Sequence, residues 1–333
     1  MTKTMAHRLL AWYDANRRGL PWRGDTDAYH IWVSEIMLQQ TRAEAVKGYY
    51  TRFLAALPTV ADLAEADDDR LLKLWEGLGY YSRARNLKRA AQIIMSEYGG
   101  VIPSAPEELL KLPGIGLYTA GAVASIAYGV PVPAVDGNVL RVLARLDADF
   151  ADISLEQTKR TAAARLLREI PQDRPGAFNQ ALMELGACLC LPNGAPKCAL
   201  CPLSGDCLAC QQSLTAELPV KSKQKPRRIE HRSLLILRFE DKLALRRRPP
   251  KGLLAGLWEL PEAFNIPVEL IISDEDAGQA LHIFTHIEWH MRAHKFTLRE
   301  AFEGEGLVWV TEAELEQFYA LPSAFAGFRG KMF

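Results

Sequence analysis

All six cysteines of this 333-residue chain lie between residues 188 and 210. Four of them follow the spacing Cys190-x7-Cys198-x2-Cys201-x5-Cys207. A disulfide scaffold would spread its cysteines along the chain, whereas four thiolates in one short loop surround a single metal centre. Structural zinc favours two CxxC pairs, and these four cysteines contain one, so the spacing favours an iron-sulfur cluster over zinc by a small margin.

Outside this loop the composition is that of an ordinary soluble protein. Hydrophobic residues make up 49% of the chain, and 40 basic side chains balance 40 acidic ones. No apolar run approaches the ~20 residues that a membrane span requires, and the N-terminal segment lacks the apolar core of a signal peptide. We therefore expect a cytoplasmic protein that does not contact a membrane, and the length predicts two domains.

The hydrophobic periodicity changes along the chain. Up to residue 210 apolar residues recur three and four apart, as in helices, in segments 5–17, 30–57, 84–99, 106–112 and 156–170. Beyond residue 230 alternation predicts strands in 233–239, 242–248, 294–302 and 307–311, followed by a helix near 311–321. We predict an all-α domain (1–210, including the cysteine loop 188–210), a linker (211–230) and a small α+β domain (231–333).

The predicted linker carries a basic run that could touch phosphates or remain solvated, formed by Lys221, Lys223, Lys225, Arg227 and Arg228.

Within the helical domain, Gly114 and Gly116 stand between two helical patterns in Leu-Pro-Gly-Ile-Gly. Alternate glycines permit a tight turn whose bare backbone N–H groups, with the start of the next helix, can bind an anion. A simple helix–helix turn is the alternative explanation of this motif. A second turn follows in which Asp136 directly precedes another helical pattern. A helix N-terminus favours the ionised carboxylate, so we expect a lowered pKa for Asp136.

Glu35 lies in the helical pattern Trp-Val-Ser-Glu-Ile-Met-Leu-Gln-Gln-Thr, on a face shared with Ile31 and Trp32. The pattern alone also fits a glutamate on a solvated helix face. On a mostly apolar face the carboxylate is disfavoured, and we then expect a raised pKa and a role as a general acid. Glu35 and Asp136 would thus be an acid and an anion.

These motifs, together with 20–23, 75–87, 178–187 and Phe-Thr-His at 284–286, resemble the MutY-type adenine DNA glycosylases of the helix-hairpin-helix superfamily. The resemblance implies a helix-hairpin-helix domain with a 4Fe-4S cluster held by Cys190, Cys198, Cys201 and Cys207. Cys188 and Cys210 would be spare thiols.

The same resemblance assigns site roles. It makes Glu35 and Asp136 catalytic, gives Asn138 a supporting hydrogen bond, and places Tyr118 near the aspartate, where endonuclease III-like relatives have a lysine. A phenol cannot form the lysine's Schiff base, so strand cleavage is not expected. Tyr80 matches the tyrosine that intercalates in the DNA, and Gln40 matches the glutamine that contacts the partner strand. Four residues match positions that line the adenine pocket: Leu20, Trp22, Arg23 and Glu184.

The C-terminal domain resembles a Nudix fold without its acidic metal-binding helix after Pro261. The short stretch up to Phe284 predicts a trimmed helix there. In the family a Phe-Ser-His loop senses 8-oxoguanine, and this chain has Phe284, Thr285 and His286, in which threonine keeps the hydroxyl.

The sequence therefore predicts a monomeric, monofunctional adenine DNA glycosylase acting on duplex DNA that contains adenine opposite 8-oxoguanine or guanine. The alternative is an endonuclease III-like glycosylase and AP lyase. Non-catalytic DNA-binding proteins and Nudix hydrolases fit less well, because the chain has both carboxylates and lacks the acidic helix.

Overall fold

The fold is described from a computed structural model, which covers residues 1–222, 225–262, 265–304 and 306–333. The chain divides into two compact units. The helical unit comprises residues 1–65 and 86–223, and the C-terminal unit comprises residues 66–85 and 224–333. Within the described ranges, no helix is long and apolar enough to cross a membrane.

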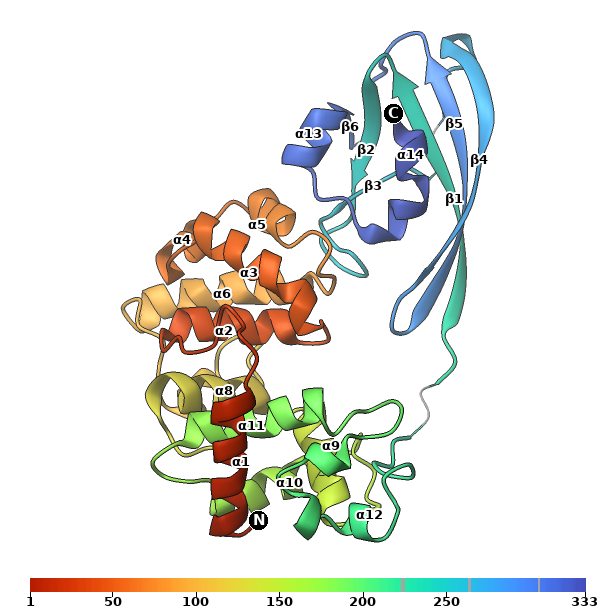
Figure 1. Cartoon of the computed structure of the whole chain (residues 1–333). Helices are drawn as coiled ribbons and strands as arrows, with labels where there is room; N and C mark the ends of the chain where they lie inside the picture. The colour runs from red at the N-terminus through yellow and green to blue at the C-terminus, as the bar shows by residue number, and fades with distance from the viewer. Residues whose placement is uncertain (223–224, 263–264, 305) are drawn as a thin grey trace. The chain divides into compact units, whose positions relative to one another are not determined.

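The helical unit is built from a series of short helices (Figure 1). They are α1 (Lys3–Asn16), α2 (Ala28–Leu38), α3 (Ala43–Ala56), α4 (Val60–Glu65), most of α6 (Ser82–Glu97), α7 (Pro106–Leu109), α8 (Leu117–Tyr128), α9 (Gly137–Leu146), α10 (Glu156–Glu169), α11 (Pro175–Cys188), η1 (Cys198–Leu200), η2 (Ser204–Asp206) and α12 (Leu208–Gln211).

The pattern over residues 30–57 predicts unbroken helix, but the structure divides it into α2 and α3. Gln40 adopts a φ of 59°, in the left-handed region that no helix interior permits. The first of the two helices is capped by Asp27, whose side chain accepts a hydrogen bond from Tyr29 N at 2.7 Å. The break turns residues 39–42 away from the helix axis and exposes them along the groove described below.

The C-terminal unit contains a mixed sheet with strand order β3-β2-β1-β5-β4, and β6 pairs with β2. Its elements are β1 (Arg228–Phe239), β2 (Lys242–Arg247), β3 (Trp258–Glu259), η3 (Val268–Leu270), β4 (Ile271–Ile283), β5 (Ile287–Leu298), β6 (Leu307–Thr311), α13 (Glu312–Gln317), η4 (Ser323–Phe328) and α14 (Arg329–Met332). β1 and β5 run parallel, from Arg228 opposite Ile287 to Arg238 opposite Thr297.

One long strand of this sheet has no signal in the sequence. β4 pairs antiparallel with β5 along nearly its whole length, although its sequence is acidic and lacks clear alternation. As an edge strand it buries only Ala277, so hydrogen bonding to β5 rather than hydrophobic patterning determines its conformation. Of the trimmed helix predicted after Pro261, the described residues contain only the single 3₁₀ turn η3, which β4 follows directly. Residues 263–264 lie outside the described residues.

The core of this unit lies between the sheet and the C-terminal helical segments, which Figure 1 shows against one face of the strands. Phe325, Phe328 and Met332 pack there against Trp289 and Met291. Burial of these large apolar side chains is what holds the last helices on the sheet.

Residues 66–85 belong to the C-terminal unit, although the predicted boundaries assign them to the helical domain. This segment contains α5 (Asp68–Leu74) and the Gly-Leu-Gly-Tyr turn. Lys73 Nζ donates to the carbonyl oxygens of Leu315 and Tyr319 at 2.9 and 3.2 Å, and Glu76 Oε1 accepts from Leu321 N at 2.9 Å. These polar contacts tie the segment to α13 and to the residues that follow it.

Candidate active site

Glu35 lies on α2 and is 5% exposed. Burial raises the pKa of its carboxyl group, which is the direction expected from its apolar helix face, and the nearby Asp136 carboxylate raises it further. The hydroxyl of Tyr118, from the first turn of α8, donates a hydrogen bond to Glu35 Oε2 and partly opposes that rise. A buried carboxyl group with a raised pKa is suited to deliver a proton.

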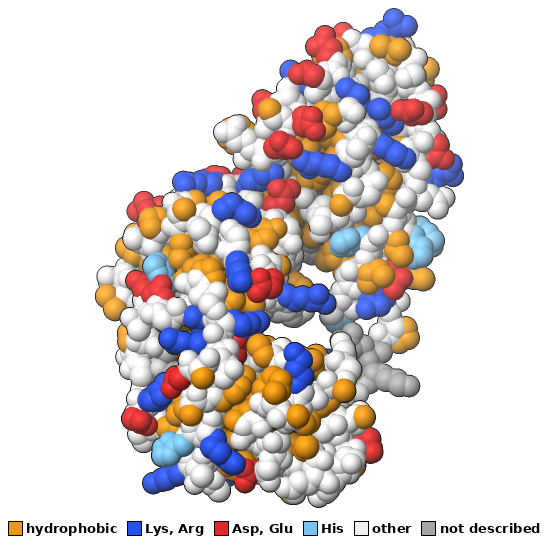
Figure 2. All heavy atoms as spheres, in the orientation of Figure 1, with side chains coloured by type: hydrophobic (Ala, Val, Ile, Leu, Met, Phe, Trp, Pro, Cys, Tyr) orange, Lys and Arg blue, Asp and Glu red, His pale blue; other side chains and the backbone are white. Residues whose placement is uncertain are grey.

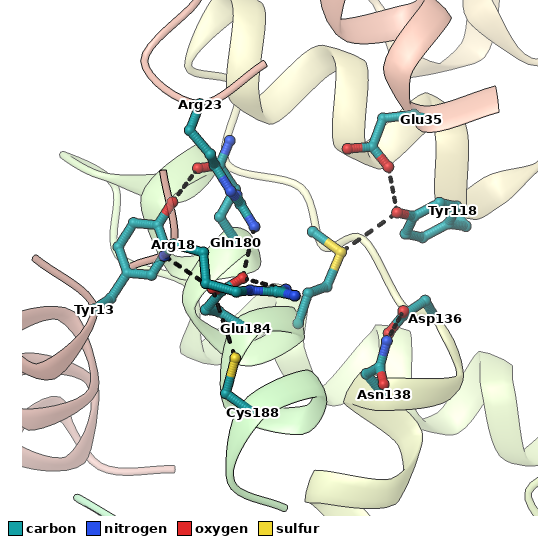
Figure 3. Close-up of polar contacts among 11 residues, drawn as sticks. Tyr13, Arg18, Arg23, Glu35, Tyr118, Asp136, Asn138, Gln180, Glu184 and Cys188 are labelled. Carbon is teal, nitrogen blue, oxygen red and sulfur yellow. Dashed lines mark hydrogen bonds and ion pairs between the residues drawn. The ribbon is translucent and has the colours of Figure 1, made fainter. Parts of the chain in front are cut away.

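Tyr118 lies between the two carboxylates in Figure 3. Its hydrogen bond goes to Glu35 rather than to Asp136, and its oxygen lies 3.4 Å from Met183 Sδ. Burial, followed by the charges of Glu35 and Asp136, raises the pKa of the phenol well above its ordinary value. Tyr118 therefore stays protonated and remains a donor to Glu35.

Asp136 is the N-cap of α9. Its Oδ1 accepts from Val139 N at 2.8 Å, and its Oδ2 accepts from Asn138 Nδ2 at 2.7 Å. The expected lowering of its pKa is wrong: burial raises the pKa of Asp136 by more than these hydrogen bonds lower it. A positive charge developing beside Asp136 would favour the ionised form again, because opposite charges nearby stabilise it.

A hydrogen-bonded chain runs from Asp136 to the cysteine loop through Arg141, a buried residue of α9. Arg141 Nη2 donates to Asn138 Oδ1 and to Gly186 O, each at 2.8 Å, and Arg141 Nε donates to Cys190 O at 2.7 Å. Asn138 in turn donates to Asp136. The position of the aspartate thus depends on the loop that holds the cysteines. Arg141 was not predicted as a site residue.

Glu184, on α11, is 1% exposed and fully engaged by two arginines (Figure 3). Arg18 Nε and Nη2 donate to it at 2.6 and 2.9 Å, and Arg23 Nη2 donates at 3.1 Å. These partners lower the pKa of Glu184 against the effect of burial. Arg23 also acts electrostatically on Glu35, lowering its pKa. Arg18 was missed, although it lies only two residues before the Leu-Pro-Trp-Arg motif.

Leu20 and Trp22, predicted to contact adenine, are buried at 5% and 4% exposure. Trp22 packs edge-on against Tyr50, with ring centroids 5.5 Å apart. Arg23, the last residue of the same motif, has an Nε that is buried without a hydrogen-bond partner in the described part of the chain. A buried donor of this kind is a group that a bound acceptor could satisfy.

A groove of about 1010 Å³ opens beside these groups. It is lined by Gln40 and the rest of the 38–42 turn, by Gly116 and Tyr118 of the hairpin, by Asp136 and Asn138, and by Lys159 and Lys221. Gly114 has a φ of 80°, and a Cβ there would lie 2.8 Å from Asn86 Cβ, so the hairpin requires glycine at this position. Of the basic run, Lys221 thus reaches the groove, and Lys223 lies outside the described residues.

The comparisons with known proteins agree with this arrangement. The profile of the HhH-GPD superfamily base excision DNA repair proteins matches residues 33–168, which include Glu35, Tyr118 and Asp136, and that of the NUDIX domain matches residues 232–328. The chain is 36% identical to the adenine DNA glycosylase of Mus musculus over 88% of this chain and 70% of the relative. The chain belongs to the adenine DNA glycosylase family.

Other members of the family are similarly related. The chain is 34% identical to the Homo sapiens adenine DNA glycosylase, over 92% of this chain and 70% of the relative. It is 39% identical to that of Arabidopsis thaliana over 86% of this chain, and spans 56% of that relative's length.

Solved structures resemble the helical unit. A thermostable thymine-DNA glycosylase aligns at 30% identity with a TM-score of 0.58, covering 63% of this chain and 96% of its own. A trapped endonuclease III–DNA covalent intermediate aligns at 23% identity with a TM-score of 0.55. The alignment covers 64% of this chain and 96% of the endonuclease III chain, and it shows that the two share a fold.

The iron-sulfur cluster expected of this family requires four thiolates. All six cysteines, which lie in the described part of the chain, are free thiols. A cavity is lined by Cys190, Cys198, Cys201, Cys207 and Cys210, with apolar side chains of α9 and α11 around them. Arg145 Nη1 donates to Cys190 Sγ at 3.3 Å. The described residues contain no group of three or more His, Cys, Asp or Glu side chains arranged to hold a single ion. The donor chemistry of the cavity nevertheless fits a sulfur-ligated cluster.

The loop of Phe284, Thr285 and His286 joins β4 to β5 in the C-terminal unit. Phe284 N donates to Ile287 O at 2.8 Å, and Arg228 N donates to His286 O at 3.0 Å, so the loop is held at the start of β5. Phe284 packs against Trp289, with ring centroids 4.8 Å apart.

Tyr80 lies against this loop within the same unit. Its hydroxyl is 2.7 Å from Thr285 Oγ1, and its ring is 45% exposed. The backbone of Tyr80 has a φ of 48°, a strained value for an aromatic residue that is consistent with a functional turn. The residue predicted to wedge DNA and the residue predicted to sense the lesion are thus hydrogen-bonded neighbours.

Basic side chains outside the groove form no single patch on the face drawn in Figure 2. Lys and Arg there are interspersed with Asp and Glu, in keeping with the equal totals of the two kinds. Binding of a polyanion therefore depends on local groups such as those of the groove rather than on the field of the whole chain.

Proposed function

We propose that this chain is a monofunctional adenine DNA glycosylase that removes adenine paired with 8-oxoguanine or guanine in duplex DNA. The observation that carries the proposal is the pairing of a buried acid, Glu35, with a helix-capping aspartate, Asp136, on either side of Tyr118 and beside a groove. Similarity to adenine DNA glycosylases over most of the chain supports the choice of base.

In this mechanism protonated Glu35 delivers its proton to N7 of the extruded adenine. The bond between adenine and C1′ of the sugar then breaks, and its electron pair leaves with the base. Asp136 balances the positive charge that develops on the sugar, either electrostatically or as a short-lived covalent adduct. Water adds to C1′ and loses a proton, which leaves an abasic site. Asn138 and Arg141 orient Asp136 for this role.

Tyr118 supports base removal without strand cleavage. Its hydroxyl is a donor to Glu35 and carries no amine that could form a Schiff base with the sugar. The alternative, an endonuclease III-like glycosylase and lyase, lacks its nucleophile at this position. The endonuclease III neighbour shares the fold only.

Recognition of the opposite base is assigned to the loop of Phe284, Thr285 and His286, with Tyr80 filling the space that the extruded adenine leaves. The hydrogen bond between Thr285 and Tyr80 supports a joint action of the two, because movement of either hydroxyl alters the other. Gln40, which lines the groove, is assigned to the partner strand.

We further propose that Cys190, Cys198, Cys201 and Cys207 hold a 4Fe-4S cluster, which braces the loop that follows α11. Through Cys190 and Arg141 this loop also supports Asn138 and Asp136. In this proposal the cluster stabilises the loop and takes no part in the reaction.

The test of the activity is a single-turnover incubation with duplexes that contain A:8-oxoguanine, A:G or C:8-oxoguanine. We expect strand breaks in the two adenine duplexes only, and only after hot alkali opens the abasic site. Breaks without alkali would favour the lyase alternative. Intact adenine duplexes after alkali would overturn the proposed function.

A further inference from the structure

Cys210 is a fifth sulfur in the cavity that the four predicted cluster ligands line. It belongs to α12, for which Cys207 is the N-cap, and its N–H donates to Cys207 O at 3.1 Å. Residues three apart on one helical turn lie on the same face, so the turn that directs Cys207 to the cavity directs Cys210 there as well.

The sixth cysteine lies elsewhere. Cys188 does not line the cavity, and its thiol is 3.7 Å from Glu184 Oε1, the carboxylate held by Arg18 and Arg23. The two cysteines expected to be spare are therefore not equivalent, because only Cys210 is placed where a metal ligand must be.

Cys198 and Cys210 both line this cavity, and the Cys210 thiol acts on the Cys198 thiol there. Cys190, in contrast, is held by Arg145 through its sulfur and by Arg141 through its carbonyl.

We propose that Cys210 is a reserve ligand that binds the cluster iron otherwise bound by Cys198. When Cys198 does not bind, the Cys210 thiol gives its proton to solvent and its sulfur forms the iron bond in place of the one lost. The exchange replaces one thiolate by another, so the charge and the oxidation state of the cluster stay the same. The inference rests on the proposed cluster.

The test compares full-length proteins purified anaerobically: wild type, Cys198→Ala, Cys198→Ala/Cys210→Ala and the matched control Cys198→Ala/Cys188→Ala. Alanine is used because a serine oxygen could itself bind iron. Iron and sulfide content and visible absorbance are measured. We expect wild type, Cys198→Ala and the Cys188 control to contain about four irons per chain, and the Cys210 double variant to lose the cluster.

Alkylation followed by peptide mapping gives a second readout. In the wild type, Cys188 and Cys210 should react while the four ligands are protected, and in Cys198→Ala, Cys210 should become protected while Cys188 still reacts.

Loss of the cluster from Cys198→Ala as complete as from the Cys210 double variant would overturn the reserve-ligand role, as would unchanged reactivity of Cys210. A wild-type protein that contains zinc and no iron would instead overturn the proposed cluster itself.

Discussion

Replacing Arg141 with glutamine should weaken both the fold and the active site. Arg141 makes hydrogen bonds to Cys190 O, Asn138 Oδ1 and Gly186 O at 2.7 to 2.8 Å. A hydrogen bond from a charged donor contributes ~1.5–3 kcal/mol, and the shorter glutamine amide can retain at most part of the set. Burying the guanidinium has a cost of its own, which offsets part of this contribution. We therefore expect the free energy of unfolding to fall by about 2–4 kcal/mol.

For a unit of about 200 residues this loss corresponds to a fall of roughly 5–10 °C in the unfolding midpoint. Because Asn138 loses its partner and holds Asp136 less firmly, single-turnover adenine excision should also slow by about tenfold or more, equivalent to about 1.4 kcal/mol.

Calorimetry and a gel assay on one preparation measure both effects. The matched control is Arg160→Gln on exposed α10. If Arg141→Gln matched this control in midpoint and rate, the proposed coupling between the cysteine loop and Asp136 would be wrong.

Three further predictions concern single contacts. Glu35 must be protonated to act, so excision should decline as pH rises through its raised pKa. The Tyr118 hydrogen bond lowers the pKa of Glu35, so Tyr118→Phe should shift the alkaline limb of the pH–rate profile to higher pH. A limb that stays in place or moves to lower pH would show that Tyr118 does not stabilise the Glu35 carboxylate. Gly114→Ala should destabilise the protein by ~1–3 kcal/mol, because residue 114 has a positive φ. Gly116→Ala should leave the stability unchanged, because a Cβ there meets nothing within 4 Å. Equal melting curves for the two variants would show that the hairpin does not require glycine at position 114. Thr285→Val keeps the shape but loses the hydroxyl, and should reduce the preference for 8-oxoguanine over guanine by ~1–3 kcal/mol; an unchanged ratio of the two excision rates would place recognition elsewhere.

Local chemistry in the sequence predicts the parts of the site that depend on neighbouring residues. The apolar helix face of Glu35 indicates its raised pKa, and the turn before α9 indicates that Asp136 caps a helix. The sign of the Asp136 pKa shift was missed, because it depends on how much of the molecule covers the carboxylate. Burial by distant segments is not visible in a helix-capping pattern.

Long-range partners were equally hidden. Arg18 reaches Glu184 across 166 positions, and Arg141 reaches Cys190 across 49. The sequence around an arginine does not reveal whether its side chain is buried against a distant partner or exposed to solvent. β4 was missed for a related reason, because pairing with β5 and not its own composition makes it a strand.

We propose above that Glu35 is the acid that releases adenine. The most direct measurement is the single-turnover excision rate of Glu35→Gln on an A:8-oxoguanine duplex at saturating protein, with Glu44→Gln, an exposed carboxylate of α3, as the matched control. We predict that Glu35→Gln binds the duplex as the wild type does and excises adenine at least ~10² to 10⁴-fold more slowly, while the control is unaffected. Excision by Glu35→Gln at a rate near that of the control would show that Glu35 is not this acid.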